Sequence, residues 1–276
     1  MQSAGVSATL GEEVAVAKGS LFPGTSQNSG LRTAIRQSGF GLAAQPIFAA
    51  EAAGGIYYQE CLARLVNLDG TECATNDLIS VVENAGAALA LDSLVMSMVL
   101  DRLNVDRSTV LGCNLSATTF ASPKSWRVIL KQLERNPHLL PRLVIEITET
   151  REIPDFSYFA EVANDLRDLG CRIALDDFGT GFSSPRLLQL ADFDIVKIDK
   201  AFLHDDRRCS DGHDSLWHMV KLASCFCDVV VVEGVENAGQ MARACEAGAT
   251  HLQGYLLARP CPIAKRHSPT MSTTPH

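Results

Sequence analysis

Short apolar runs alternate with longer amphipathic segments along most of this chain. The runs are aliphatic or β-branched at nearly every position, which is typical of strands buried on both faces of a parallel sheet. The longer segments carry apolar residues at helical spacing, and Gly170 and Gly248 each follow one, where glycine commonly ends a helix. The predicted strands are 41–48, 56–60, 110–114, 143–146, 172–176, 194–197, 229–233 and 251–257. The predicted helices are 78–103, 126–135, 159–169, 215–227 and 240–247.

About eight strands in one α/β unit favour a closed barrel over an open sheet. The first two strands are separated only by residues 49–55, which is too short for a helical crossover, so they should pair antiparallel. The predicted fold is therefore a modified TIM (β/α)8-type barrel with one antiparallel strand near the start.

The 276 residues fit one large domain with less regular ends. Residues 1–37 are rich in Ser, Gly, Thr and Ala and are predicted to form a flexible N-terminal extension; 38–262 form the barrel, and 263–276 a disordered tail. The apolar runs are too short to span a bilayer, and the N-terminus lacks the basic start of a secretory signal. A cytoplasmic protein without a membrane span is expected.

The composition limits the classes of ligand that the chain is expected to bind. The net charge is −8 and the pI about 5.4, so the chain has no general attraction for a nucleic-acid polymer. An anionic ligand would need local positive charge, which metal ions supply. The nine cysteines follow no disulfide spacing and are expected to be reduced, buried thiols, as at Cys113 and Cys225.

Polar residues at the ends of the predicted strands form the candidate site. The carboxyl ends of parallel barrel strands point to one face, so these side chains should share a rim. Carboxylates crowded together need compensating cations, and oxygen-only ligands favour Mg2+ or Mn2+ over zinc. The residues are Glu60, Asn114, Glu146, Asp176, Asp177, Lys197, Glu233 and Gln253.

The adjacent Asp176 and Asp177 can face one site only where the strand alternation stops. The glycines at 179 and 181 permit the necessary turn. One aspartate could then bridge two metals, a pair able to clamp a phosphate and activate water.

Each residue also has a simpler explanation. A single glutamate after a strand is commonly a helix cap or a solvated charge, Asn114 could start a turn, and Lys197 could be a structural ion-pair residue. A polar group at the end of six successive strands is hard to explain in this way.

The chain resembles the EAL-domain family of cyclic-di-GMP phosphodiesterases over about residues 40–260. The resemblance rests on eight motifs in the family's order. They are QPIF at 45–48, ECLARL at 60–65, NLS at 114–116, EITE at 146–149, DDFGTGFSS at 176–184, KID at 197–199, EGVE at 233–236 and QGYLLARP at 253–260.

The resemblance implies a role for each matching residue. Two metals, Mg2+ or Mn2+, would be held by Glu60, Asn114, Glu146, Asp176, Asp177 and Glu233. Lys197 would contact the attacking water, with a pKa lowered enough to act as general base, and would form the catalytic group with Glu60 and Glu233. Arg64 and Gln253 would contact substrate, while Glu149, Glu236 and Phe182 would support the site and the 177–184 loop, through which a homodimer would form.

Three positions depart from the family's pattern. Cys61 replaces the middle alanine of the signature and should point away from Glu60. Phe182 replaces the usual tyrosine, and Pro185 replaces leucine, which removes a backbone donor from the loop. None of the three removes a metal ligand.

The leading functional prediction is metal-dependent hydrolysis of cyclic-di-GMP to linear pGpG. The alternative is a catalytically inactive cyclic-di-GMP receptor or protein-interaction module on the same barrel. A third hypothesis, a Schiff-base enzyme with Lys197 as nucleophile, leaves the carboxylates unexplained. The N-terminal extension could dock a protein partner.

Overall fold

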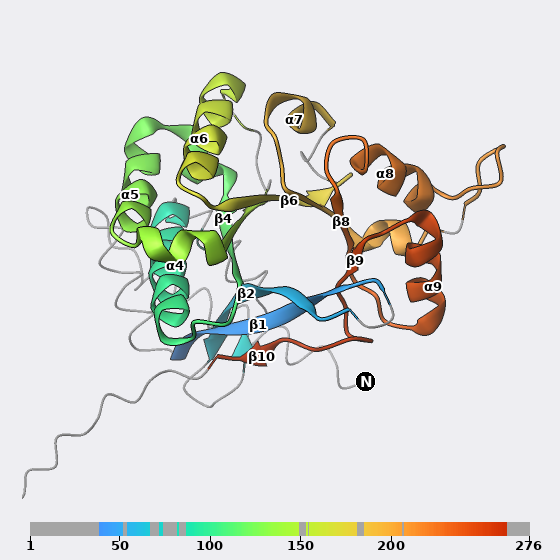
Figure 1. Ribbon diagram of the computed structural model, residues 1–276, viewed down its shortest axis with the longest axis horizontal. Coiled ribbons are helices and arrows are strands. Elements are labelled where there is room, and N and C mark those ends of the chain that lie inside the picture. The colour runs from blue at the N-terminus through green and yellow to red at the C-terminus, as the bar shows by residue number, and fades with distance from the viewer. Residues whose placement is uncertain are drawn as a thin grey trace, which may run out of the picture.

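A closed ring of eight strands forms the centre of the molecule (Figure 1). The computed structural model describes residues 39–51, 54–66, 72–73, 82, 87–148, 153, 155–180, 185–205 and 207–263. Around the ring the order is β1, β9, β8, β7, β6, β5, β4 and β2, and β2 pairs again with β1. The ring strands are β1 Gly39–Ala49, β2 Ile56–Val66, β4 Leu111–Ser116, β5 Leu143–Thr148, β6 Arg172–Phe178, β7 Ile195–Ile198, β8 Val229–Val232 and β9 His251–Leu252. Two short strands, β3 Glu72–Cys73 and β10 Cys261–Pro262, pair with β2 and β1 outside the ring.

One strand of the ring runs against the others. β1 pairs antiparallel with both β2 and β9, whereas every other neighbouring pair in the ring is parallel. The Ala49 N–H donates to the Gly55 carbonyl at 3.3 Å across the connection between β1 and β2. The predicted barrel with one antiparallel strand near its start is confirmed.

Helices pack around the parallel strands of the barrel (Figure 1), and several of them begin at side-chain caps. Ser122 accepts from the Ser125 N–H at the start of α5, and Asp155 accepts from two N–H groups at the start of α6. Gly170 and Gly248, with φ of 90° and 98°, follow α6 and α9 in the left-handed conformation expected of them. The helices are α4 Ala88–Val105, α5 Pro123–Glu134, α6 Phe156–Asp168, α7 Pro185–Leu190, α8 Ser215–Ala223 and α9 Ala238–Ala247, with 3-10 turns η1 Ala117–Ala121, η2 Pro137–Arg142 and η3 Lys200–Leu203.

Some boundaries differ from the prediction. β2 continues six residues beyond Glu60 because it pairs with β1 along its whole length, up to Val66 against Gly39. β9 ends at Leu252 rather than at 257, since the chain then turns, with the Leu257 N–H bonded to the Gly254 carbonyl. The short α7 was not predicted, because six residues give no helical periodicity.

Proline at the start of α7 fits the structure. Pro185 is the first residue of this helix. An N–H at that position would have no partner inside the helix, so proline costs no helical hydrogen bond there.

The apolar interior has two parts. Outward-facing strand residues such as Ile145, Val196 and Val230 pack under the helices. A separate cluster fills the barrel itself and consists of Ile47, Tyr58, Val144, Ala174, Ile195 and Val231. Along β5, β6 and β7 the members of this cluster, Val144, Ala174 and Ile195, each precede a residue of the candidate site by two positions, so apolar side chains fill the barrel on the amino-terminal side of that site.

The expectation of buried thiols holds only in part, since Cys209, Cys225, Cys245 and Cys261 are exposed. Cys61 and Cys113 are buried in the outer core, so Cys61 does point away from Glu60. Cys225 is exposed, contrary to expectation, because it lies just past the end of α8 on the solvent side.

The predicted extension, 1–37, and the predicted tail, 263–276, lie outside the described residues apart from Ile263. Within the described part of the chain, no helix combines the length and the apolar character needed to cross a membrane.

Replacing Phe159 with alanine should destabilise the fold strongly. Its fully buried ring packs edge-on against Phe120 at 5.9 Å and near Phe193 at 6.4 Å. Phe159→Ala should lower the free energy of unfolding by about 3–5 kcal/mol, measured by urea denaturation. The control Phe226→Ala, at a ring that is 39% exposed, should change it by less than about 0.5 kcal/mol; equal effects would contradict the described core.

Candidate functional site

A buried lysine lies among four carboxylates inside the barrel. Lys197 on β7 has no exposed surface. Its Nζ lies 2.7 Å from Glu146 Oε2, 2.8 Å from Asp176 Oδ1, 2.8 Å from Glu233 Oε1 and 3.2 Å from Glu60 Oε2. One ammonium thus faces four acidic groups from four different strand segments, and its single positive charge cannot balance them all.

Strand register brings these side chains together. Asn114 on β4 lies beside Glu146 on β5, and Glu60 on β2 lies beside Gly112 on β4. Because strand residues alternate between faces, these positions point into the barrel.

Most of the site residues were predicted to be the last residues of their strands, and the structure places them differently. Glu60, Asn114, Glu146, Asp176 and Lys197 lie within their strands, and only Glu233 and Gln253 follow theirs. The site therefore lies inside the mouth of the barrel rather than on its rim, which explains its burial.

Glu60 is held by three donors. Its Oε1 accepts from Asn114 Nδ2 at 2.9 Å, and its Oε2 accepts from Gln253 Nε2 at 2.8 Å and from Lys197. Burial by itself would raise the pKa of Glu60, but the Lys197 charge and the two amide donors outweigh it and lower that pKa. Glu60 is therefore an anion in this site.

Glu146 is more deeply buried than Glu60, and its negative charge is less well compensated. Burial raises its pKa to about 8, and the charges of Glu60 and Asp176 add to this against the opposing effect of Lys197. Its Oε2 also accepts from the Tyr58 hydroxyl at 3.2 Å. Its Oε1 and the Oδ1 of Asn114 are buried oxygens without a hydrogen-bond donor among the described residues. Buried acceptors of this kind suit a cation.

Asp176 and Asp177 reach one site through a break in β6. Pairing with β7 loses register between Leu175 and Phe178, and Asp177 has φ of 51°, in the left-handed region. This break stops the alternation of faces. The prediction that both aspartates face one site where the alternation stops is confirmed, although the break lies within the strand and not at its end. Gly179, with φ of 96°, continues the turn.

The acidic residues form two groups that share one member. Oxygens of Glu60, Glu146 and Asp176 lie within 4.8 Å of one another, and so do those of Asp176, Asp177 and Glu233. Oxygen-only donor sets suit Mg2+ or Mn2+. Burial raises the pKa of Asp176 and of Glu233, and the charge of Glu60 raises both further against the opposing effect of Lys197. The residues present therefore fit divalent metal, and Asp176 is common to both groups.

The lowered pKa expected at Lys197 refers to a site filled by cations; among the carboxylates alone the shift has the opposite direction. Burial acts to lower that pKa, but Asp176, Glu146, Glu233 and Glu60 together raise it well above its usual range. The side chain is a proton donor here, which also disfavours a Schiff-base nucleophile.

The other predicted site residues do not all lie at the acidic cluster. Arg64 is partly buried and lies four residues beyond Glu60 on the same face of β2. Gln253 is buried against Glu60, whereas Glu236 is exposed and its backbone N–H donates to Gln240. The two loop residues, Glu149 and Phe182, lie outside the described residues.

Three further residues that shape the candidate site were not predicted from the sequence. Tyr58 donates to Glu146, Gln45 accepts from Gln253 Nε2 at 3.4 Å, and Gly112 leaves room for the Glu146 carboxylate. Alternation could have indicated Tyr58 and Gly112, which precede Glu60 and Asn114 by two residues and so share their faces.

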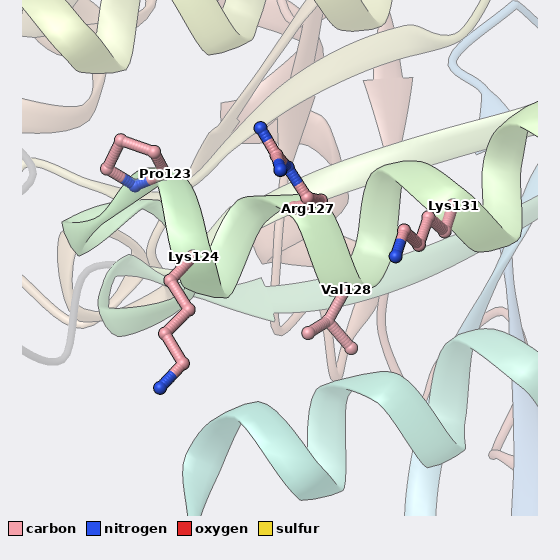
Figure 2. A pocket seen from close by; sticks show the side chains of 5 residues that line it. All are labelled: Pro123, Lys124, Arg127, Val128 and Lys131. Atoms are coloured by element: carbon pink, nitrogen blue, oxygen red, sulfur yellow. The ribbon is translucent and has the colours of Figure 1, made fainter.

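A surface hollow elsewhere on the molecule is separate from this site. It is lined by Pro123, Lys124, Arg127, Val128 and Lys131, all on α5 at the outside of the barrel (Figure 2). None of the acidic cluster contributes to its lining.

Comparisons with known proteins agree with this geometry. The chain matches the EAL domain family over residues 28–260, starting within the predicted extension. It is 32% identical over 246 residues to the signaling protein YkoW of Bacillus subtilis (strain 168), covering 86% of this chain and 30% of that protein. It is 27% identical over 237 residues to the cyclic di-GMP phosphodiesterase PdeF of Escherichia coli (strain K12), covering 84% and 31%. A solved PaMucR phosphodiesterase in complex with c-di-GMP aligns with a TM-score of 0.70 at 27% identity, covering 81% of this chain and 97% of that chain.

The chain spans about a third of the length of these two curated relatives. The alignment therefore concerns the barrel and not the other parts of those proteins.

Removing the lysine charge should destabilise the protein without metal. Lys197→Met keeps an unbranched side chain, one atom shorter, but leaves buried carboxylates unpaired, so the free energy of unfolding should fall by about 3–5 kcal/mol at neutral pH. The loss should shrink as pH falls, because protonated carboxylic acids need no counter-charge. Denaturation in the presence of a chelator measures this, with Lys131→Met on exposed α5 as control. A variant as stable as the wild type at neutral pH would show that the ammonium does not compensate the cluster.

Filling the space at Gly112 should disturb Glu146. A Cβ there would collide with Glu146 Oε1 and approach Tyr58 Cε2 to 2.8 Å. Gly112→Ala should cost about 1–3 kcal/mol of stability, measured by denaturation. In Gly41→Ala on β1, where the new Cβ meets nothing within 4 Å, stability should be unchanged. Two identical denaturation curves would refute the packing described at Gly112.

Proposed function

The chain belongs to the EAL domain family, and from this premise we propose that it hydrolyses cyclic-di-GMP to linear pGpG with the help of two divalent cations. The observation that carries the proposal is the presence of two clusters of three acidic residues around Lys197, with Asp176 a member of both. A relative named as a cyclic di-GMP phosphodiesterase, and a solved relative in complex with c-di-GMP, support the choice of substrate.

The cation ligands follow from the two acidic groups. Glu60, Glu146 and Asp176, with Asn114 Oδ1, would hold one cation, and Asp176, Asp177 and Glu233 the other. Bound Mg2+ or Mn2+ would polarise a phosphoryl oxygen and lower the pKa of a water molecule.

The proposed reaction cleaves one phosphodiester bond. The oxygen of a water molecule joins phosphorus while the bond from phosphorus to the 3′ oxygen breaks, since pGpG keeps the phosphate on its 5′ end. The water loses a proton and the departing 3′ oxygen gains one. The protein must therefore supply both a proton acceptor and a proton donor near one phosphate.

Lys197 is the proposed proton-handling residue at this phosphate. As an ammonium it would stabilise negative charge on the phosphate or donate to the 3′ oxygen. For it to accept a proton instead, as the family resemblance implies, the carboxylates around it must be neutralised, which bound cations would do. Glu60 and Glu233 would fix its position from opposite sides of the barrel.

The substrate would lie over the barrel mouth. Arg64 would bind its second phosphate, because it shares the face of Glu60 and lies further along β2. Gln253 would contact substrate or water while keeping Glu60 oriented through their 2.8 Å hydrogen bond.

The segment after Asp177 is the proposed dimer contact. The family resemblance gives this loop, with Glu149 and Phe182, a role in joining two subunits. Glu236, exposed near the start of α9, would act only indirectly on the site.

A hydrolysis assay with a matched pair of variants tests the function. Purified protein with Mg2+ or Mn2+ should convert cyclic-di-GMP to pGpG, followed by nucleotide chromatography. Glu60→Ala removes the carboxylate that three donors orient, so turnover should fall at least about 1,000-fold. Glu134→Ala, on the exposed side of α5, should leave it unchanged.

Binding measurements separate the two functional hypotheses. Calorimetry on the wild type with cyclic-di-GMP and Ca2+ gives affinity apart from turnover. Tight binding with intact dinucleotide after long incubation in both Mg2+ and Mn2+ would instead identify a receptor and overturn the proposal.

A further inference from the structure

A tight hairpin precedes α8 on the outside of the barrel. Arg208 and Asp214 form an isolated antiparallel bridge. The Cys209 N–H donates to the His213 carbonyl at 2.7 Å, and the Gly212 N–H donates to the Cys209 carbonyl at 3.0 Å. Gly212 has φ of 86°, which glycine adopts readily. The hairpin backbone is thus fixed by its own hydrogen bonds.

Three side chains with different donor atoms meet at this hairpin. Cys209 and Asp211 come from the hairpin, and His218 comes from the first turn of α8. Their sulfur, carboxylate oxygen and imidazole nitrogen atoms lie within 4.8 Å of one another. The Nε2 of His218 lies 3.2 Å from Asp211 Oδ2. Cys209 and Asp211 are exposed and His218 is partly buried, so a solute ion can reach the cluster.

We propose that Cys209, Asp211 and His218 bind one divalent cation of the zinc type. Thiolate, imidazole and carboxylate are the ligands zinc takes in proteins, whereas Mg2+ prefers oxygen alone. Ligand atoms around a tetrahedral zinc ion lie about 3.5 Å apart, so small side-chain rotations would close the site. Binding displaces the thiol proton of Cys209 to solvent, and water completes the coordination.

Neighbouring groups leave this donor set clear. His213 stacks on the Trp217 ring with centroids 3.9 Å apart, which holds it out of the set. The Arg208 guanidinium donates to the Gly212 carbonyl at 2.9 Å, and that of Arg207 pairs with Asp205 at 2.8 Å. Both guanidinium groups therefore hydrogen-bond to acceptors outside the set of Cys209, Asp211 and His218.

The hairpin site differs from the barrel site in position and in chemistry. It uses sulfur, nitrogen and oxygen donors on the surface, whereas the barrel site uses oxygen donors inside the mouth. A soft or borderline cation would select the hairpin, and a hard cation would select the barrel. Loss of one site should leave the other intact.

Cobalt titration tests the hairpin site directly. The full chain, freed of metal by a chelator and kept reduced, is titrated with Co2+, whose thiolate complexes absorb through sulfur-to-cobalt charge transfer. One equivalent should produce this band in the wild type and equally in Glu60→Ala, which disables only the barrel site. Cys209→Ser should abolish the band, and His218→Ala should weaken Zn2+ affinity at least tenfold in competition with Co2+.

Cys245→Ser is the matched control, because Cys245 is another exposed free thiol, on α9. Its band should equal that of the wild type, and circular dichroism should show every variant folded. A wild-type protein without the band, or a band that survives in Cys209→Ser and disappears in the control, would overturn the proposal.

Discussion

The excess of carboxylates over positive charge inside the barrel is the constraint on which the site depends. One ammonium, Lys197, contacts four acidic side chains, and burial keeps water from sharing their charge. The raised pKa of Glu146 and the lowered pKa of Glu60 show how unevenly that single charge is distributed. Such an arrangement favours the binding of cations, and so a fold that tolerates the cluster is also one that can concentrate divalent metal in one place.

The barrel makes this concentration possible by its connectivity. A reversed β1 closes the ring between β2 and β9, which leaves seven parallel strands whose carboxyl ends share one mouth. The apolar plug around Tyr58 closes the other end. Small adjustments then shape the site: the absent side chain at Gly112 makes room for Glu146, and the left-handed Asp177 turns a second carboxylate toward the first.

The two proposed cation sites would respond to different conditions in solution. Oxygen donors in the mouth suit abundant hard cations, while the Cys209 hairpin suits scarcer ions that bind sulfur and nitrogen. The hairpin leads directly into α8, and Met219 of that helix packs near Gly179, just beyond the Asp176–Asp177 pair.

The sequence by itself determined the fold class, the antiparallel start and the identity of the acidic residues, because short apolar runs and the polar residues at their ends are local features. It could not determine how deep inside the barrel these residues lie. Whether Glu60 ends a strand or lies inside one depends on how far β2 pairs with β1. That pairing consists of hydrogen bonds between residues that are distant in sequence. The charge state of Lys197 likewise followed only from tertiary structure, since the direction of its pKa is decided by four carboxylates that are distant in sequence. The meeting of Cys209 with His218 was equally hidden, because it requires a turn at Gly212 and the first turn of α8 to face each other.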